Sequence, residues 1–139
     1  GSQRILDLFE KGTTVEENLG AAEICRRAGV KVWANCIFGA PSETREDTLG
    51  TVKMIRTIRP DHLSASFFTP TPGSHMAERI EAEGQAVVDP FNGSCRSPNE
   101  AKLKGVDYEW LTQVIAFAER GGAEQQLQTL FGDTTCASL

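Results

Sequence analysis

The sequence has no long hydrophobic run and no excess of basic residues. No apolar stretch approaches the roughly 20 residues that span a bilayer, and the first residues lack the basic-then-apolar order of a signal peptide. Lys and Arg number 14 against 19 Asp and Glu, and the basic residues are scattered along the chain. The composition therefore predicts a cytoplasmic protein and argues against membranes and nucleic acids as partners.

The sequence also lacks the cysteine spacing of a metal site. The four cysteines show no C-x-x-C pair and no other short spacing of the kind that metal sites use. We therefore assign no metal ligand in this chain. Cys25 falls on the apolar side of a predicted helix and Cys36 within a predicted strand, where a free thiol usually behaves as a small buried hydrophobe.

Hydrophobic periodicity predicts alternating helices and strands in the first 84 residues. Apolar residues recur at helical spacing over 13–28, and Thr13 and Thr14 each stand three residues before a glutamate, as in a capping box. Residues 30–38 are almost uninterruptedly apolar, which is typical of a parallel strand covered on both faces. Thr44, with Asp47 three residues later, opens a helix over 44–58, and a strand over 61–68 and a short helix capped by Ser74 follow.

The two strands begin about 32 residues apart, which is close to the repeat length of an eight-unit β/α barrel. We predict an α/β fold: a partial TIM-barrel-like fragment of about three β/α units in residues 1–84. An extended segment and C-terminal helices, at 107–119 and 123–131, are expected to pack on it within residues 85–139. Two or three parallel strands cannot make a well-covered sheet. The chain is therefore expected to be a piece of a larger protein or to assemble with copies of itself.

The stretch VWANCIFGAPSET, residues 32–44, marks the carboxyl end of the first strand. Ligands of α/β folds collect at such ends, because the loops converge there and the helix N-termini point their amides inward. Gly39 allows backbone to approach a ligand closely, and Pro41 fixes the turn. A plain β/α turn with a capping threonine explains the same residues, so both interpretations stay open.

These motifs also resemble a known family. FGAPSET after an apolar strand, preceded by GSQRILDLFEKGTTVEENLGAAEICRRAGVKVWAN and followed by IRPDHLSASFFTPTPGS, resembles the second half of a radical S-adenosylmethionine (SAM) enzyme barrel. The likeness is greatest to the group with an N-terminal cobalamin-binding domain, whose tail is similar to KLKGVDYEWL. It implies a parent Fe–S oxidoreductase that cleaves SAM reductively at a [4Fe–4S] cluster and acts on a small-molecule substrate. In members that use cobalamin, the chemistry is often methylation or rearrangement.

The resemblance implies seven cofactor-binding positions: Arg4, Asn35, Ile37, Gly39, Glu43, Phe68 and Thr69. The stretch from Asn35 to Gly39 matches the motif that lines adenine, with Ile37 as its branched apolar side chain. Asn35 stands where many members have glycine, and Glu43 matches a glutamate that braces the loop.

The other implied positions flank this motif. Arg4 lies in the turn near the ribose and the methionine carboxylate, and guanidinium grips carboxylates in two-pronged fashion. Phe68 and Thr69 follow the next strand, near adenine or substrate. The residues alone also allow Arg4 to be a solvated side chain and Phe68 to be a core residue.

The cluster motif of that family, C-x-x-x-C-x-x-C, is absent from the sequence. We therefore expect the isolated chain to hold no cofactor tightly, to bind SAM poorly, to be inactive, and to carry no catalytic residue. It should self-associate through open strands that expose Trp33, Asn35, Ile37 and Phe68. Replacing Gly39 by valine should weaken SAM binding with little loss of fold. Two alternatives remain: another β/α-barrel enzyme with a phosphate at the 39–44 turn, or a non-catalytic interaction module.

Overall fold

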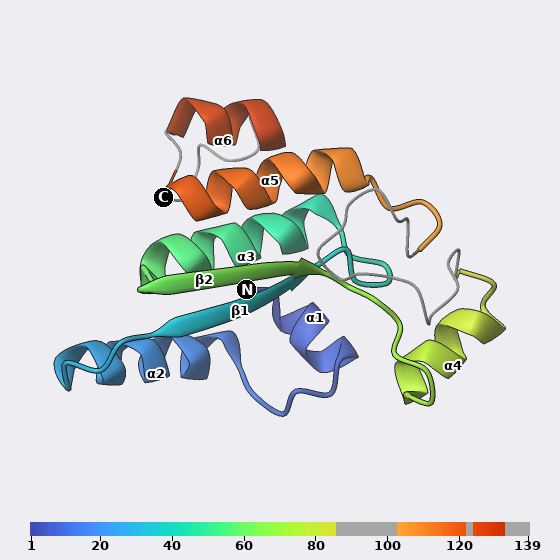
Figure 1. Cartoon of the computed structure of the whole chain (residues 1–139), viewed down its shortest axis with the longest axis horizontal. Helices are drawn as coiled ribbons and strands as arrows, with labels where there is room; N and C mark the ends of the chain where they lie inside the picture. Colours follow the sequence, from blue (N-terminus) through green and yellow to red (C-terminus); the bar gives the residue numbers. More distant parts are fainter. Residues whose placement is uncertain (86–102, 122–123, 133–139) are drawn as a thin grey trace.

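The computed structural model describes residues 1–85, 103–121 and 124–132. Within these residues two parallel strands, β1 (Trp33–Phe38) and β2 (His62–Phe67), are joined through helix α3 (Arg45–Ile58) (Figure 1). The other helices are α1 (Gln3–Leu8), α2 (Val15–Arg27), α4 (His75–Ala82), α5 (Tyr108–Arg120) and α6 (Glu124–Phe131). The predicted combination of helices with parallel strands is thus confirmed. The predicted extended segment and the end of the chain fall mainly in 86–102 and 133–139, outside the described residues.

Helices α2, α3 and α4 begin close to where the sequence predicts, whereas α1 lies where a turn was expected. Thr14 caps α2 and exchanges hydrogen bonds with Glu17, so of the two candidate threonines it is the second that forms the capping box. Thr44 and Asp47 form the same motif at α3, and Ser74 caps α4. Each capping side chain accepts a hydrogen bond from a backbone N–H that the first helical turn leaves without a partner. Local spacing therefore sets where the strands end and the helices start.

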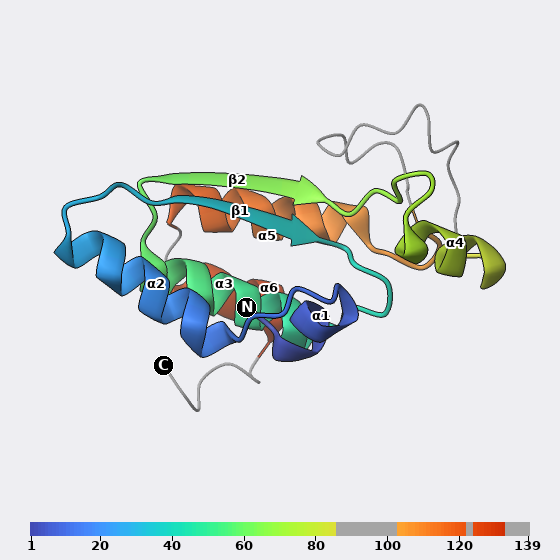
Figure 2. The same ribbon diagram turned by 90° about the horizontal axis from the view of Figure 1, so that it is seen from below.

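The sheet is covered on one face only, and the prediction of a strand covered on both faces is wrong. In Figure 2 the helices lie to one side of β1 and β2, and no helix lies against the other side. The strands pair in register, so one face carries six side chains, which we call the open face: Trp33, Asn35, Ile37, His62, Ser64 and Ser66. Trp33 is 68% exposed and Ile37 45% exposed. The apolar run predicted burial, but the described residues supply no layer for this face.

The core lies on the other face of the sheet. Phe38 of β1 is fully buried, and Phe67 lies beside it in β2. Helix α5 packs on β2 and α3, and the ring of Tyr108 meets that of Phe67 edge to face. The core cluster consists of Cys36, Phe38, Val52, Ile55, Phe67, Tyr108, Leu111, Val114, Phe117 and Leu127. Helix α5 therefore shares a core with the two strands, and Cys36 is a buried hydrophobe, as predicted.

Phe68 does not lie open, contrary to the prediction from strand alternation. Strand β2 ends at Phe67, so alternation stops there, and Phe68 turns into a small separate cluster. Its ring stacks on that of Phe9, with centroids 5.5 Å apart, and packs near Ile80 and Leu103. Phe68 thereby ties the end of β2 to the segment that follows α1.

The described helices are all too short or too polar to cross a bilayer.

Candidate functional site

Both strands end at the same edge of the sheet, and each leads into a tight turn. Strand β1 runs into residues 39–44, which we call the β1–α3 turn, and β2 runs into residues 69–74 before α4. Figure 1 shows the two arrowheads together, with α4 beyond them. The edge predicted to hold a ligand is therefore the place where the turns converge.

Gly39 at the start of the β1–α3 turn is held against helix α5. Its φ is +75°, a conformation that residues with a Cβ rarely adopt. A Cβ placed there would lie 3.1 Å from Leu111 Cδ1 and 3.4 Å from Val106 Cγ1. Valine at this position would strain both backbone and core, so the expectation of little loss of fold is wrong.

We predict that Gly39→Ala lowers the free energy of unfolding by about 1–3 kcal/mol, since it adds a close contact to an unfavourable φ. The matched control is Gly73→Ala, because Gly73 has a similar φ of +77° and no atom within 4 Å of its would-be Cβ. Urea unfolding of both variants separates the two effects. Equal losses in the two variants would contradict the packing role of Gly39.

Glu43 braces the β1–α3 turn from within. Its Oε2 accepts a hydrogen bond from the Ala40 amide at 2.8 Å, and its Oε1 accepts one from Thr48 Oγ1 at 2.8 Å. Burial raises the pKa of this carboxyl above its ordinary value, although the hydrogen bonds from Ala40 and Thr48 oppose the shift. The bracing role implied by the resemblance agrees with these contacts.

Asp47 is the most heavily hydrogen-bonded carboxylate in the described part of the chain, and sequence reasoning gave it only a capping role. It accepts from Thr44 N at 2.9 Å, from Thr44 Oγ1 at 2.8 Å, from the Ser2 hydroxyl and from the Arg4 guanidinium. Burial opposes its ionisation, but the bonds from Arg4, Ser2 and Thr44 outweigh it and hold the pKa of Asp47 well below its usual range. The carboxylate therefore stays charged at neutral pH.

Arg4 faces this carboxylate and the β1–α3 turn. It pairs with Asp47 and donates from Nη2 to the Ser42 carbonyl oxygen at 2.6 Å. The hydrogen bond to Asp47 raises the pKa of Arg4 above its ordinary value. The sequence indicated an arginine suited to carboxylates, and the carboxylate that it grips here belongs to the protein.

The remaining predicted positions divide between the open face and the turns. Asn35 and Ile37 lie on the open face and are exposed. Thr69 is half-buried and donates from Oγ1 to the Phe67 carbonyl oxygen at 3.4 Å, whereas Phe68 is buried in its own cluster. The structure thus brings Arg4 and Glu43 to the same turn and leaves Asn35 and Ile37 available to a ligand.

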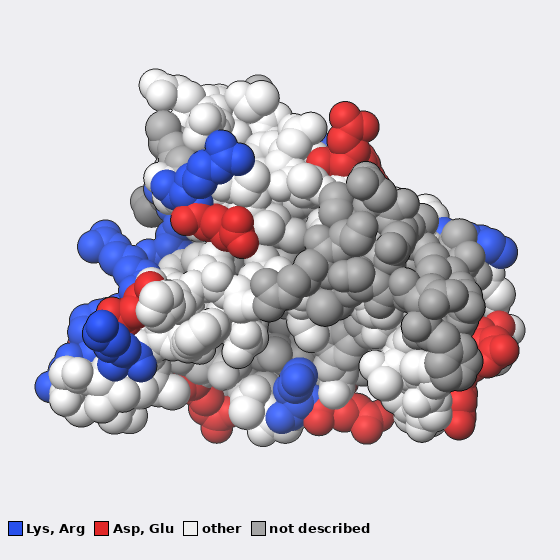
Figure 3. Space-filling view, in the orientation of Figure 1, with Lys and Arg blue, Asp and Glu red and all other residues white. Residues whose placement is uncertain are grey.

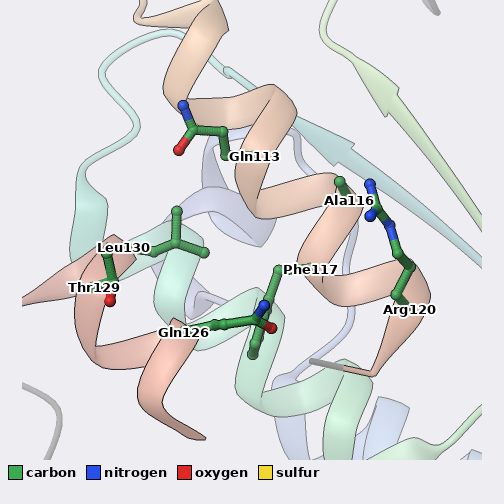
Figure 4. Close-up of a pocket in the computed structure, with 7 residues that line it drawn as sticks. All are labelled: Gln113, Ala116, Phe117, Arg120, Gln126, Thr129 and Leu130. Atoms are coloured by element: carbon green, nitrogen blue, oxygen red, sulfur yellow. The ribbon is translucent and has the colours of Figure 1, made fainter. Parts of the chain in front are cut away.

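The described residues line several cavities near these elements. One of 350 Å³ lies on the outer side of the β1–α3 turn, between Glu43 and Trp110, and one of 450 Å³ follows the edge of β1 beside α2. A third, of 350 Å³, separates α5 from α6 (Figure 4) and is lined by Gln113, Ala116, Phe117, Arg120, Gln126, Thr129 and Leu130. Its one charged lining residue has no acidic or nucleophilic partner there, so this third cavity offers no catalytic arrangement.

Metal ligation has no candidate in the part of the chain that the structure describes. No three His, Cys, Asp or Glu side chains among those residues are grouped so that they could hold an ion.

Comparison with known proteins relates the chain to enzymes. It is 31% identical over 114 residues to an uncharacterized methyltransferase of Pyrococcus horikoshii, which covers 82% of this chain and 25% of the relative. It is 35% identical over 80 residues to a tRNA-2-methylthio-N(6)-dimethylallyladenosine synthase of a Sulfurihydrogenibium species (56% and 18%). It is 38% identical over 79 residues to an anaerobic magnesium-protoporphyrin IX monomethyl ester cyclase of Cereibacter sphaeroides (57% and 13%). These relatives are enzymes.

The methylthio synthase and the cyclase are radical SAM enzymes, so the comparison supports the coarser part of the resemblance. No protein-family model matches the sequence. The chain spans a quarter or less of the length of these curated relatives. The chain therefore resembles part of an enzyme, and these similarities alone do not assign it the activity of a whole relative.

Proposed function

We propose that this chain is part of a radical SAM enzyme and that its open face contacts the adenosine of SAM beside the β1–α3 turn. The similarity to a methylthio synthase and an anaerobic cyclase carries the proposal, because both are radical SAM enzymes. The two parallel strands and their helices would then belong to a partial β/α barrel, whose interior is the open face.

The open face suits an uncharged planar ring. Ile37 offers an exposed apolar surface, and the Asn35 amide can both donate and accept hydrogen bonds. None of the six side chains of this face is an acid, a lysine or an arginine. In Figure 3 the described surface over the strands, left of the centre, is mostly uncharged, with charged groups to its left and above it. An adenine ring needs such an apolar surface and a few hydrogen bonds to its edge.

The cluster does not fit the residues of this chain. The sequence lacks the three-cysteine motif that would bind it. We therefore propose that the cluster, and cobalamin if the parent uses it, are held by residues of the parent outside this chain. SAM and the cluster together would supply radical chemistry, whereas the residues here would orient SAM and exclude water. The isolated chain is accordingly expected to bind SAM weakly and to be inactive.

The geometry argues against a phosphate at residues 39–44. A helix N-terminus binds phosphate through free backbone N–H groups. At α3 the Thr44 amide donates to Asp47, the Asp47 amide donates to Thr44 Oγ1, and the Ala40 amide donates to Glu43. Because the carboxylates of Asp47 and Glu43 already occupy two of these amides, a phosphate would meet negative charge. The non-catalytic interaction module remains the alternative that a binding experiment must separate.

We predict that Ile37→Asp abolishes the weak binding of SAM and leaves the fold intact. Ile37 is 45% exposed, so the change costs little burial, but it places a carboxylate on the surface proposed to meet adenine. The matched control is Ile24→Asp, since Ile24 is 61% exposed and lies on α2, away from the open face. Equilibrium dialysis with millimolar SAM tests both variants. Equal affinities in the two variants, or none in the wild-type chain, would favour the interaction module.

Self-association is a second expectation that the open face supports. Within the described residues β1 pairs with β2 alone, so its outer edge presents unpaired backbone groups beside the exposed Trp33 and Ile37. Copies of the chain should therefore associate through these strands. Sedimentation equilibrium over a range of concentrations measures this, and a chain that remains monomeric at the highest concentration contradicts it.

A further inference from the structure

We propose that Arg4 and Asp47 form a clamp that positions the β1–α3 turn, and that neither side chain binds SAM directly. That SAM is the ligand rests on the proposed function, whereas the existence of the clamp rests only on contacts within this chain. It assigns Arg4 a different task from the carboxylate binding that the resemblance implies.

Asp47 is the centre of the clamp because it joins the start of α1 to the start of α3. It accepts from Thr44 at the start of α3, from the Ser2 hydroxyl before α1, and from Arg4 in the first turn of α1. Only 11% of its side chain is exposed. A buried carboxylate with this many donors has little freedom to serve a ligand, and the donors from Ser2 and Arg4 hold the start of α1 against the start of α3.

The guanidinium of Arg4 donates hydrogen bonds to two residues, Asp47 and Ser42. Nε and Nη2 point to Asp47, while Nη2 and Nη1 reach the carbonyl and hydroxyl oxygens of Ser42, the latter at 3.3 Å. Ser42 has a φ of +57°, which a residue with a side chain adopts only when its surroundings enforce it. The guanidinium therefore holds the tip of the turn in a conformation that the backbone alone disfavours.

Disruption of the clamp should reach the ligand through the turn. Ala40 and Glu43 exchange hydrogen bonds within the turn, and within the described residues neither is hydrogen-bonded to Arg4 or Asp47. If the clamp holds the turn, loss of either member frees both amides. SAM bound at the edge of the open face would then lose a preformed wall. Arg4 and Asp47 should act as one unit, so removing the second after the first should change nothing more.

The test is a double-mutant cycle of Arg4→Gln and Asp47→Asn in the full 139-residue chain. Two readouts are followed: amide hydrogen exchange of Ala40 and Glu43, and affinity for SAM by NMR titration. We expect each single variant to speed exchange and weaken SAM binding by about tenfold, with the double variant no worse than either. If Asp47→Asn does not fold, Arg4→Lys carries the exchange test, because lysine keeps the charge but cannot reach both partners.

The control is Glu17→Gln, which removes the corresponding carboxylate from the capping box of α2. It should leave the exchange of Ala40 and Glu43 unchanged. Weaker SAM binding in Arg4→Gln alone, with Asp47→Asn like wild type, would overturn the proposal and make Arg4 a direct ligand. Unchanged exchange in both single variants would also overturn it. If the single variants exchange faster but the wild-type chain binds no SAM, the clamp is supported and the proposed function is rejected.

Discussion

Phe38→Ala is expected to lower the free energy of unfolding by about 3–5 kcal/mol, enough to unfold much of the chain. Phe38 is fully buried among residues of α3, β2 and α5, so its removal leaves a cavity at the centre of the core. Thermal unfolding followed by circular dichroism measures the loss.

The control for this prediction lies on the same strand. Trp33→Ala also removes a large aromatic ring, but from the open face, where Trp33 is 68% exposed. We expect a change within about 1 kcal/mol, since little burial is lost. A loss similar to that of Phe38→Ala would mean that the open face is covered in solution, which would contradict the one-sided sheet.

Asp47→Ala is expected to cost about 2–3 kcal/mol at neutral pH. The change removes the carboxylate that accepts hydrogen bonds from Ser2, Thr44 and Arg4, and it leaves Arg4 without its counter-ion. Half of the Arg4 side chain is exposed, so water screens part of that loss. Glu17→Ala in the α2 capping box is the control, and it should cost about 1 kcal/mol or less because its surroundings are exposed.

The Asp47 effect should also depend on pH in a definite direction. The folded-state pKa of Asp47 lies below its ordinary value, so its contribution is complete above a pH of about 4. As the pH falls from there towards the folded-state pKa, the carboxylate is protonated and the contribution is lost. The gap in stability between wild type and Asp47→Ala should therefore narrow in acid. A gap that is constant from neutral pH into strong acid would show that the charge of Asp47 does not stabilise the fold.

Local signals in the sequence predicted most of the described elements. The spacing of Thr44 and Asp47 located the start of α3, and Ser74 located the start of α4, because a capping bond involves residues only three positions apart. Parallel pairing followed from two apolar segments separated by a helix. These features depend on neighbours along the chain, which a sequence displays directly.

The features that the sequence did not reveal depend on residues far apart. The pairing of Arg4 with Asp47 spans 43 positions, and no local pattern indicates it. Phe68 was expected to be open because alternation was extended one residue beyond the strand, whereas its ring stacks on Phe9. The sequence did not predict that β1 is covered on one face only, because an apolar run shows that a strand could be buried on both faces and not whether anything covers them. The layer that would cover Trp33 and Ile37 is not among the described residues.

The central claim is that the open face and the β1–α3 turn meet the adenosine of SAM, and the most direct measurement is a titration of the ¹⁵N-labelled chain with SAM, followed residue by residue. We predict saturable shifts in the amides of Asn35, Ile37 and the residues of 39–44 other than Pro41, reproduced by adenosine, with little change around the cavity between α5 and α6. Shifts confined to that other cavity, or no shifts at any concentration of SAM, would contradict it.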